Sequence, residues 1–286
     1  MPDRSVPVAV VGTLNLDLVV TVDRRPQVGE TVMGRGLTER PGGKGANQAR
    51  ATGAGGAMVG VVGDDDAGRL MTRALADAGV DVTHVTTSPT VSGRAIVEVD
   101  AAGDNRIVVI AGANHDLSAD QVVAALDALD PQVVLTQLES PLEVTEAVAG
   151  WSRGHGRRFI LNPSPAVELD PQLLASADPL VVNAGEARFY AGAGSEDPVV
   201  LVNRLLERAT SVVMTLGGDG TVVAADGRIE RIETQKVDVV DTTGAGDHFV
   251  GVLATLLAEG QGLVQAATAA TRAATELVAT PLSARF

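Results

Sequence analysis

Residues 57–63, AMVGVVG, and residues 67–79, AGRLMTRALADAG, place a short valine-rich run directly before a segment whose apolar residues recur at helical spacing. The run is typical of a buried strand and the segment after it of a helix. The same alternation recurs at 6–12, 118–130, 132–138, 143–154, 157–162, 179–183, 198–209 and 211–217. Strands joined through helices pair in parallel by right-handed crossovers, and the helices cover both faces of the sheet. The sequence therefore predicts an α/β fold, with three α/β/α layers around a mostly parallel central sheet.

Two segments, approximately residues 16–43 and 92–114, interrupt this alternation. The second has a hairpin pattern with AAGDN, residues 101–105, as its turn. Neither segment has a helix to cover it, so we expect both to form a small β-sheet that projects from the main one and serves as a lid or as an association surface. The sequence contains no internal repeat or long linker, so residues 1–286 are predicted to form a single domain.

Composition excludes several classes of function. A formal net charge of −14 argues against a nucleic-acid partner, which needs basic surface. The absence of cysteine excludes disulfides, thiolate metal sites and a cysteine nucleophile. Residues 1–20, MPDRSVPVAVVGTLNLDLVV, show neither a convincing signal-peptide cleavage site nor a membrane-length apolar span. We therefore expect a cytoplasmic protein with no nucleic-acid and no membrane partner.

The stretch DTTGAGDHF, residues 241–249, leads into an apolar segment with helical spacing, which predicts a helix that begins near Gly244. The first amides of a helix have no intrahelical partner, and the helix dipole adds positive partial charge, so an anion binds well there. The carboxylate of Asp247 has two interpretations. It is a favourable charge in the first helical turn, or a general base beside an anion hole.

A second glycine cluster, PGGKGANQA, occupies residues 41–49. It combines bare backbone at Gly42 and Gly43 with the donor Lys44 and the amide of Asn47, and its spacing matches neither a P-loop nor a dinucleotide-binding fingerprint. One interpretation is a glycine turn before a helix. The other is a site for a polyhydroxylated ligand, whose hydroxyls need matched donors and acceptors.

Polar residues also follow predicted strands. Asn15 and Asp17 alternate with leucines in GTLNLDLVV, residues 12–20, and so share one face of a strand. Glu139 follows the run at 132–138. Solvent exposure explains the pair Asn15 and Asp17 as well as function does, although ligands of open α/β sheets bind at the carboxyl ends of strands.

Two further stretches have a structural and a functional interpretation. In VVNAGEA, residues 181–187, Asn183 and Glu186 are a helix N-cap with a capping box, or an amide and a carboxylate that hold magnesium through its waters. The stretch MTLGGDG, residues 214–220, is a hairpin turn or a backbone platform against a nucleotide.

In order along the chain, GTLNLDLVV, PGGKGANQA, VGDDDAG, ILNPSPA, VVNAGEA, VVMTLGGDG and DTTGAGDHF resemble the ribokinases, within the ribokinase-like carbohydrate kinase superfamily, from residue 8 to about residue 275. The GGKGAN and TTGAGD elements are specific when they occur together at this separation. The first is more typical of ribokinases than of fructokinases or nucleoside kinases, and deoxyribokinases share it. The resemblance implies phosphorylation of D-ribose at O5 by ATP, with magnesium bridging the nucleotide phosphates.

The resemblance also implies a role for each matching position. Asp247 would be the base, with an anion hole formed by the amides of Gly244, Ala245 and Gly246. The sugar would be held by Asn15, Asp17, Gly43, Lys44, Asn47 and Glu139. The nucleotide side would be lined by Asn183, Thr215, Gly217, Gly220 and Gly246. Glu186 would bind Mg²⁺ through water, and Asp241 and Thr243 would form half of a K⁺ site. The small sheet would close over the sugar and form a homodimer contact.

The sequence departs from the family pattern at two places. His248 stands where the family usually has Thr. Family members continue past the late alanine-rich helix into a Gly/Ser-containing turn, whereas residues 275–286 read TELVATPLSARF. That turn supplies part of the adenine wall and the other half of the K⁺ site, so the resemblance leaves potassium activation and nucleotide affinity open.

Two alternatives to a ribokinase follow. One is a related kinase that acts on deoxyribose or another small sugar. The other is a sugar-binding sensor that kept the pocket and lost nucleotide chemistry. Intact Asp247 and the glycine-rich amides before it favour an enzyme.

Overall fold

The computed structural model describes residues 6–192, 194–281 and 285, and its larger sheet confirms the predicted α/β fold. Within these residues the sheet has nine strands in the order β13-β12-β11-β10-β9-β8-β1-β4-β5. The strands from β11 to β5 pair in parallel, and β12 runs antiparallel to both of its neighbours. The strands are β1 (Val8–Val11), β4 (Gly56–Gly63), β5 (Asp81–Ser88), β8 (Val133–Thr136), β9 (Arg158–Leu161), β10 (Leu180–Asn183), β11 (Val212–Thr215), β12 (Thr221–Ala225) and β13 (Arg228–Ile232).

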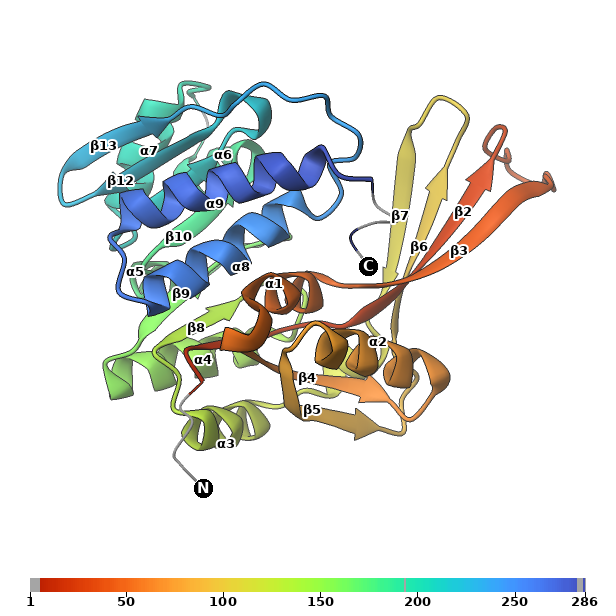
Figure 1. Ribbon diagram of the computed structural model, residues 1–286, viewed down its shortest axis with the longest axis horizontal. Helices are drawn as coiled ribbons and strands as arrows, with labels where there is room; N and C mark the ends of the chain where they lie inside the picture. The colour runs from red at the N-terminus through yellow and green to blue at the C-terminus, as the bar shows by residue number, and fades with distance from the viewer. Residues whose placement is uncertain (1–5, 193, 282–284, 286) are drawn as a thin grey trace.

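Helices cover both faces of this sheet. Side chains that alternate along β1 belong to two separate buried clusters, Ala9 and Val11 to one and Val8 and Val10 to the other. The first cluster includes α3 (Ala119–Leu129), α4 (Leu142–His155), α5 (Pro171–Ala175), α6 (Ala184–Ala191) and α7 (Pro198–Leu206). The second includes α1 (Lys44–Thr52), α2 (Asp66–Asp77), α8 (Ala245–Ala258) and α9 (Leu263–Val278), which lie in front of the sheet in Figure 1. The three predicted layers are present.

A second, four-stranded sheet projects from this body (Figure 1). Its order is β3-β2-β6-β7, and its strands are β2 (Asn15–Val22), β3 (Gly34–Gly42), β6 (Gly93–Val99) and β7 (Asn105–Ile110). The antiparallel pair of β6 and β7 is the predicted hairpin. The two segments that lack covering helices thus form the small sheet. That this sheet closes as a lid, and that the chain forms a single domain, stay predictions.

One edge of the large sheet collects the polar residues expected to function. Because β1, β8, β10 and β11 are parallel, their carboxyl ends meet at the same edge. The chain leaves this edge toward Asn15 after β1, Glu139 after β8, Asn183 at the end of β10 and Thr215 at the end of β11.

In the described part of the chain, no helix is long and apolar enough to cross a membrane.

Candidate active site

The glycine cluster at the start of α1 packs directly against the turn between β1 and β2. Gly43 has a φ of +90°, and a Cβ atom there would lie 2.8 Å from the backbone nitrogen of Asn15. A Cβ at Gly45 would lie 2.5 Å from the backbone nitrogen of Thr13. Only bare backbone permits this approach, and it brings the start of α1, with Lys44 and Asn47, beside Asn15.

Glu139 and Asn15 are both fixed by hydrogen bonds at this junction. The Oε2 atom of Glu139 accepts hydrogen bonds from the Thr13 hydroxyl at 2.5 Å and from the Lys44 amide at 3.2 Å. The Oδ1 atom of Asn15 accepts one from Asn114 at 2.9 Å. Asn15 is only 3% exposed, so solvent exposure does not explain this residue. Asn114, which also bonds both backbone groups of Leu14, was not foreseen because it lies in the turn after β7.

The carboxyl groups of Asp17, Glu139 and Asp247 share this region, and their charges contribute to the raised pKa values of Asp17 and Asp247. Burial raises the pKa of Asp17 to about 6. The charge of Arg40 opposes this rise, whereas the negative charges of Glu139 and Asp247 add to it. The cluster therefore favours cationic or hydroxyl-bearing groups, because a further anion would meet repulsion.

Asp247 is held by side chains of α1 as well as lying at the start of α8. Its Oδ2 accepts a hydrogen bond from Asn47 at 3.2 Å and its Oδ1 accepts one from Gln48 at 3.0 Å. Burial raises the pKa of Asp247, against the Lys44 charge and the hydrogen bonds of Gln48 and Asn47, which lower it. A raised pKa and a fixed orientation suit a general base. A role limited to the dipole of α8 would not require these contacts.

Gln48 belongs to a buried amide network that sequence reasoning missed. Its Nε2 also donates to Asn162 at 3.0 Å, and its Oε1 accepts from Gln137 at 2.5 Å. Asn162 in turn donates to the carbonyl of Val181 at 3.0 Å. Gln48 and Asn162 stand inside the motifs PGGKGANQA and ILNPSPA, but no spacing rule distinguishes them from their neighbours. The network connects α1, β8, β9 and β10 to Asp247.

The predicted anion hole has two amides available. Gly244 is the N-cap of α8 with a φ of 72°, and the Ala245 amide donates to the carbonyl of Thr242 at 3.2 Å. Within the described residues, the amides of Gly244 and Gly246 have no backbone acceptor. They can therefore bind an anion beside Asp247.

Two cavities meet at this helix start. A cavity of about 190 Å³ is lined by Lys44, Asn162, Ser164, Val181, Val182, Asn183, Glu186, Thr215, Gly244, Gly246, Asp247 and Val250. A larger one of about 720 Å³ shares Asn183, Thr215 and Gly246 with it. The larger cavity is in the range of sites for drug-sized ligands. The small cavity therefore forms a passage between the large cavity and Asp247.

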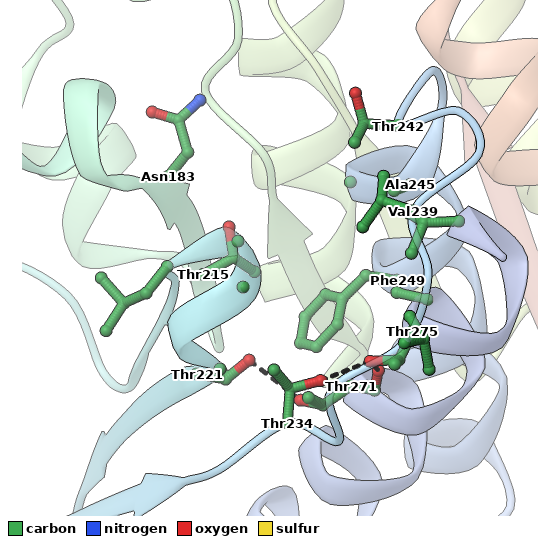
Figure 2. Close-up of a pocket in the computed structure, with 18 of the residues that line it drawn as sticks. Asn183, Thr215, Thr221, Thr234, Val239, Thr242, Ala245, Phe249, Thr271 and Thr275 are labelled. Carbon is green, nitrogen blue, oxygen red and sulfur yellow. Dashed lines mark hydrogen bonds between the residues drawn. The ribbon is translucent and has the colours of Figure 1, made fainter.

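The large cavity, drawn in Figure 2, is lined mostly by backbone, methyl groups and hydroxyls. Gly217 and Gly220 line it from the predicted hairpin of β11 and β12. Two hydroxyl pairs close its floor, Thr221 with Thr271 at 2.9 Å and Thr234 with Thr275 at 2.5 Å (Figure 2). The α9 threonines were not foreseen, because a threonine in a helix carries no sequence signal for a pocket.

Asn183 and Glu186 form the capping box that the sequence suggested. The Asn183 Oδ1 accepts from the Glu186 amide and the Glu186 Oε2 accepts from the Asn183 amide, both at 2.9 Å. Glu186 nevertheless lines the small cavity. Among the described residues, no group of three or more His, Asp or Glu side chains could hold a metal. A metal here would depend on phosphate oxygens and water, with one carboxylate nearby.

His248 follows Asp247 and is half-buried against two arginines. Burial and the positive charges of Arg50 and Arg285 lower the pKa of His248. The imidazole is therefore neutral at neutral pH and adds no charge to the start of α8.

A polar cluster that faces a nucleotide-sized cavity across an anion-binding helix start is typical of a small-molecule kinase. A model of the family described as pfkB family carbohydrate kinase matches residues 7–284, and the chain belongs to this family. It is 38% identical over 273 residues to ribokinase of Bacillus subtilis (strain 168), covering 93% of this chain and 91% of that relative. It is 32% identical over 257 residues to deoxyribokinase of Salmonella typhi, covering 86% and 84%.

The solved structure of Arabidopsis thaliana ribokinase complexed with ribose and ATP superposes with a TM-score of 0.86 at 29% identity, covering 96% of this chain and 93% of that one. The predicted resemblance and enzyme class are confirmed. The protein is a ribokinase-like carbohydrate kinase that uses ATP.

Proposed function

We propose that the protein transfers the γ-phosphoryl group of ATP to O5 of D-ribose, giving ribose 5-phosphate and ADP. The observation that carries this proposal is the position of Asp247. Its carboxylate is fixed by Asn47 and Gln48 and lies in the passage between the polar cluster and the large cavity, beside the amides of Gly244 and Gly246. The ribose and ATP bound to the Arabidopsis relative support the choice of ligands.

The chemistry follows from this placement. The sugar hydroxyl loses its proton to Asp247, and its oxygen bonds to the γ-phosphorus as the bond to the ADP oxygen breaks. The free amides of Gly244 and Gly246 and the charge of Lys44 stabilise the negative charge on the transferred group, whereas the Ala245 amide, which the resemblance also implied, donates to the Thr242 carbonyl. Most of the rate gain in phosphoryl transfer comes from such positioning and charge stabilisation.

The remaining predicted residues divide between the two substrates. The sugar is held by Asn15, Asp17, Gly43, Lys44, Asn47 and Glu139, and the nucleotide by Asn183, Thr215, Gly217, Gly220 and Gly246. The carboxylates and amides around the β1–β2 turn support the first group, since directional partners are needed for hydroxyls. Glu186, which lines the small cavity, would hold Mg²⁺ through its waters, and the ion would offset the negative charge of the ATP phosphates.

An assay of ADP release with ribose, 2-deoxyribose and fructose tests this function. We expect ribose to be preferred, because a site that bonds the 2-hydroxyl leaves its partners unpaired when that group is absent. Asp247→Asn should lower kcat by about a thousandfold or more, whereas Asp77→Asn, at an exposed position of α2, should change nothing. A preference for 2-deoxyribose would assign the protein to the deoxyribokinases, and an unchanged kcat in Asp247→Asn would remove its role as base.

The sensor alternative makes the opposite calorimetric prediction. A sensor binds ribose and does not bind ATP, whereas the kinase binds both. The nucleotide-sized cavity, which is next to the small cavity lined by Asp247, favours the kinase.

We also propose association of two chains through the small sheet. The edge strand β7 exposes Ile107, Val108, Val109 and Ile110, each at least 46% exposed. An edge strand of this composition is a template for pairing with a second chain. Light scattering in solution tests it, since a monomeric mass at micromolar concentration contradicts it.

A further inference from the structure

The side chain of Arg285 reaches the loop that leads into α8. Its Nη1 donates a hydrogen bond to the carbonyl of Thr243 at 2.8 Å, and its Nη2 donates one to the carbonyl of Asp241 at 2.5 Å. Its Nε donates to the carbonyl of Thr280, just after α9, at 3.0 Å. The Arg285 carbonyl itself accepts a hydrogen bond from Arg50 of α1. The guanidinium thus donates hydrogen bonds to three main-chain oxygens at once. The hydrogen bond from Arg50 also fixes the backbone of Arg285.

These contacts act on the peptide planes next to the anion hole. In a trans peptide the C=O of one residue and the N–H of the next point in opposite directions within one plane. The hydrogen bond from Arg285 to the Thr243 carbonyl therefore fixes the direction of the Gly244 amide, which points away from the guanidinium. Gly244 has a left-handed backbone conformation, and as a glycine it has wide freedom in φ and ψ. Fixing the peptide plane before Gly244 restricts that freedom.

The same loop is where the sequence resemblance implied half of a potassium site, and the structure does not fit that ion. A potassium ion bound through the carbonyl oxygens of Asp241 and Thr243 would have to share both oxygens with Arg285, because both already accept hydrogen bonds from its guanidinium. The guanidinium carries a permanent positive charge at this position. A second cation beside it would meet direct Coulomb repulsion.

We propose that Arg285 takes the place of a monovalent cation: its guanidinium holds the Asp241 and Thr243 carbonyls, orients the Gly244 amide toward the transferred phosphoryl group, and makes turnover independent of potassium. Only the catalytic part of this proposal rests on the kinase function proposed above. Arg285 is a positioning residue, since it acts through the loop and lies behind the amides that face the anion.

The test compares wild type with Arg285→Ala, Arg285→Lys and a control, Arg272→Ala. Arg272 is an exposed arginine of α9 that pairs with Glu276, so its removal tests loss of an arginine charge away from the loop. Sugar-dependent ADP release is measured at equal ionic strength in potassium, sodium and tetramethylammonium chloride, and again with millimolar guanidinium chloride added.

Wild type and Arg272→Ala should turn over equally in the three salts, within about twofold. Arg285→Ala should lose kcat by about tenfold to a hundredfold in tetramethylammonium, the range for residues that orient a catalytic group. Potassium or guanidinium should raise the kcat of Arg285→Ala at least fivefold, because either cation can bind the carbonyl oxygens that Arg285 no longer contacts. Arg285→Lys should retain intermediate activity, since an ammonium lacks the planar fork that spans two oxygens.

Thermal unfolding without substrates gives a second readout that does not depend on activity. Arg285→Ala should show a higher Tm in potassium than in tetramethylammonium, and wild type should show no such difference. If the protein phosphorylates no sugar, this readout still decides the role of Arg285.

Three results would overturn the proposal. Wild type activated more than tenfold by potassium would show that a metal is required. An unchanged kcat in Arg285→Ala would show that the loop needs no clamp. A loss that neither potassium nor guanidinium relieves, together with a lowered Tm in every salt, would assign Arg285 a purely structural role.

Discussion

The two sides of Asp247 are built from different materials. The side proposed for the sugar is a cluster of carboxylates and amides cross-linked by hydrogen bonds, such as Glu139 with Thr13 and Asn15 with Asn114. The side proposed for the nucleotide is a larger cavity lined by glycine backbone, methyl groups, the ring of Phe249 and paired threonine hydroxyls (Figure 2). Recognition of hydroxyls needs directional partners, whereas an aromatic base is held mainly by buried area and shape. The difference teaches that specificity lies on one side of the site and room on the other.

The electrostatics follow the same division. The raised pKa values in the site belong to Asp17 and Asp247, which lie at the polar cluster and whose pKa values are raised first by burial and then by the charge of Glu139. Positive potential reaches the large cavity from the start of α8 and from Lys236 in its wall. Three substitutions break or sharpen this contrast.

Filling the passage between the two sides should have the largest effect. Gly246→Leu adds a side chain to the residue that lines both cavities, where an added Cβ meets no atom within 4 Å. We expect normal folding and a loss of kcat/KM of about a thousandfold, equal to about 4 kcal/mol. Gly154→Leu is the matched control, since it is also helical with open space around its Cβ. Retained activity in Gly246→Leu would contradict a phosphate path through this point.

Removing the Gln48 amide, which donates a hydrogen bond to the proposed base, should have a smaller effect. Gln48→Leu keeps the volume and removes the donor to Asp247 Oδ1, so kcat should fall about tenfold to a hundredfold. The KM for ATP should stay within about twofold, because Gln48 does not line the large cavity. A rise in the KM for ATP with kcat unchanged would place Gln48 on the nucleotide side. Circular dichroism and Tm give the folding control.

Neutralising Asp17 should produce the smallest of the three free-energy changes. The change is in the free energy of unfolding, and it depends on pH. A carboxyl with a folded pKa near 6 and an ordinary value of 3.8 loses stability as the pH rises from 3.8 through 6, because its charged form is disfavoured in the folded state. The difference in unfolding free energy between Asp17→Asn and wild type should therefore increase by about 1–2 kcal/mol, in favour of the variant, when the pH rises from 5 to 8. Urea denaturation at the two pH values measures this. Asp77→Asn should show no such gain, and an equal gain in both variants would refute the assignment to Asp17.

Particular residues show where sequence reasoning was sufficient. The start of α8, with Asp247 in its first turn, was predicted correctly because a glycine-rich turn before a helix is a local pattern, and the role of Asp247 as base stays a proposal. The two interpretations of Asn183 and Glu186 turned out to be compatible in geometry, since the capping box leaves Glu186 at the wall of the small cavity. Solvent exposure of Asn15 was wrong as an explanation, because the pattern of β2 does not show that Asn114 covers it.

The sequence by itself determined the three layers, the small sheet and the chemical character of the two glycine clusters, because strand and helix periodicity and glycine turns are encoded within a few adjacent residues. Only the tertiary structure decided which side chains hold Asp247 and the loop before α8. Gln48 meets Asp247 across 199 positions, and Arg50 meets Arg285 across 235. Such contacts depend on how whole elements pack, and no local spacing in the chain records them.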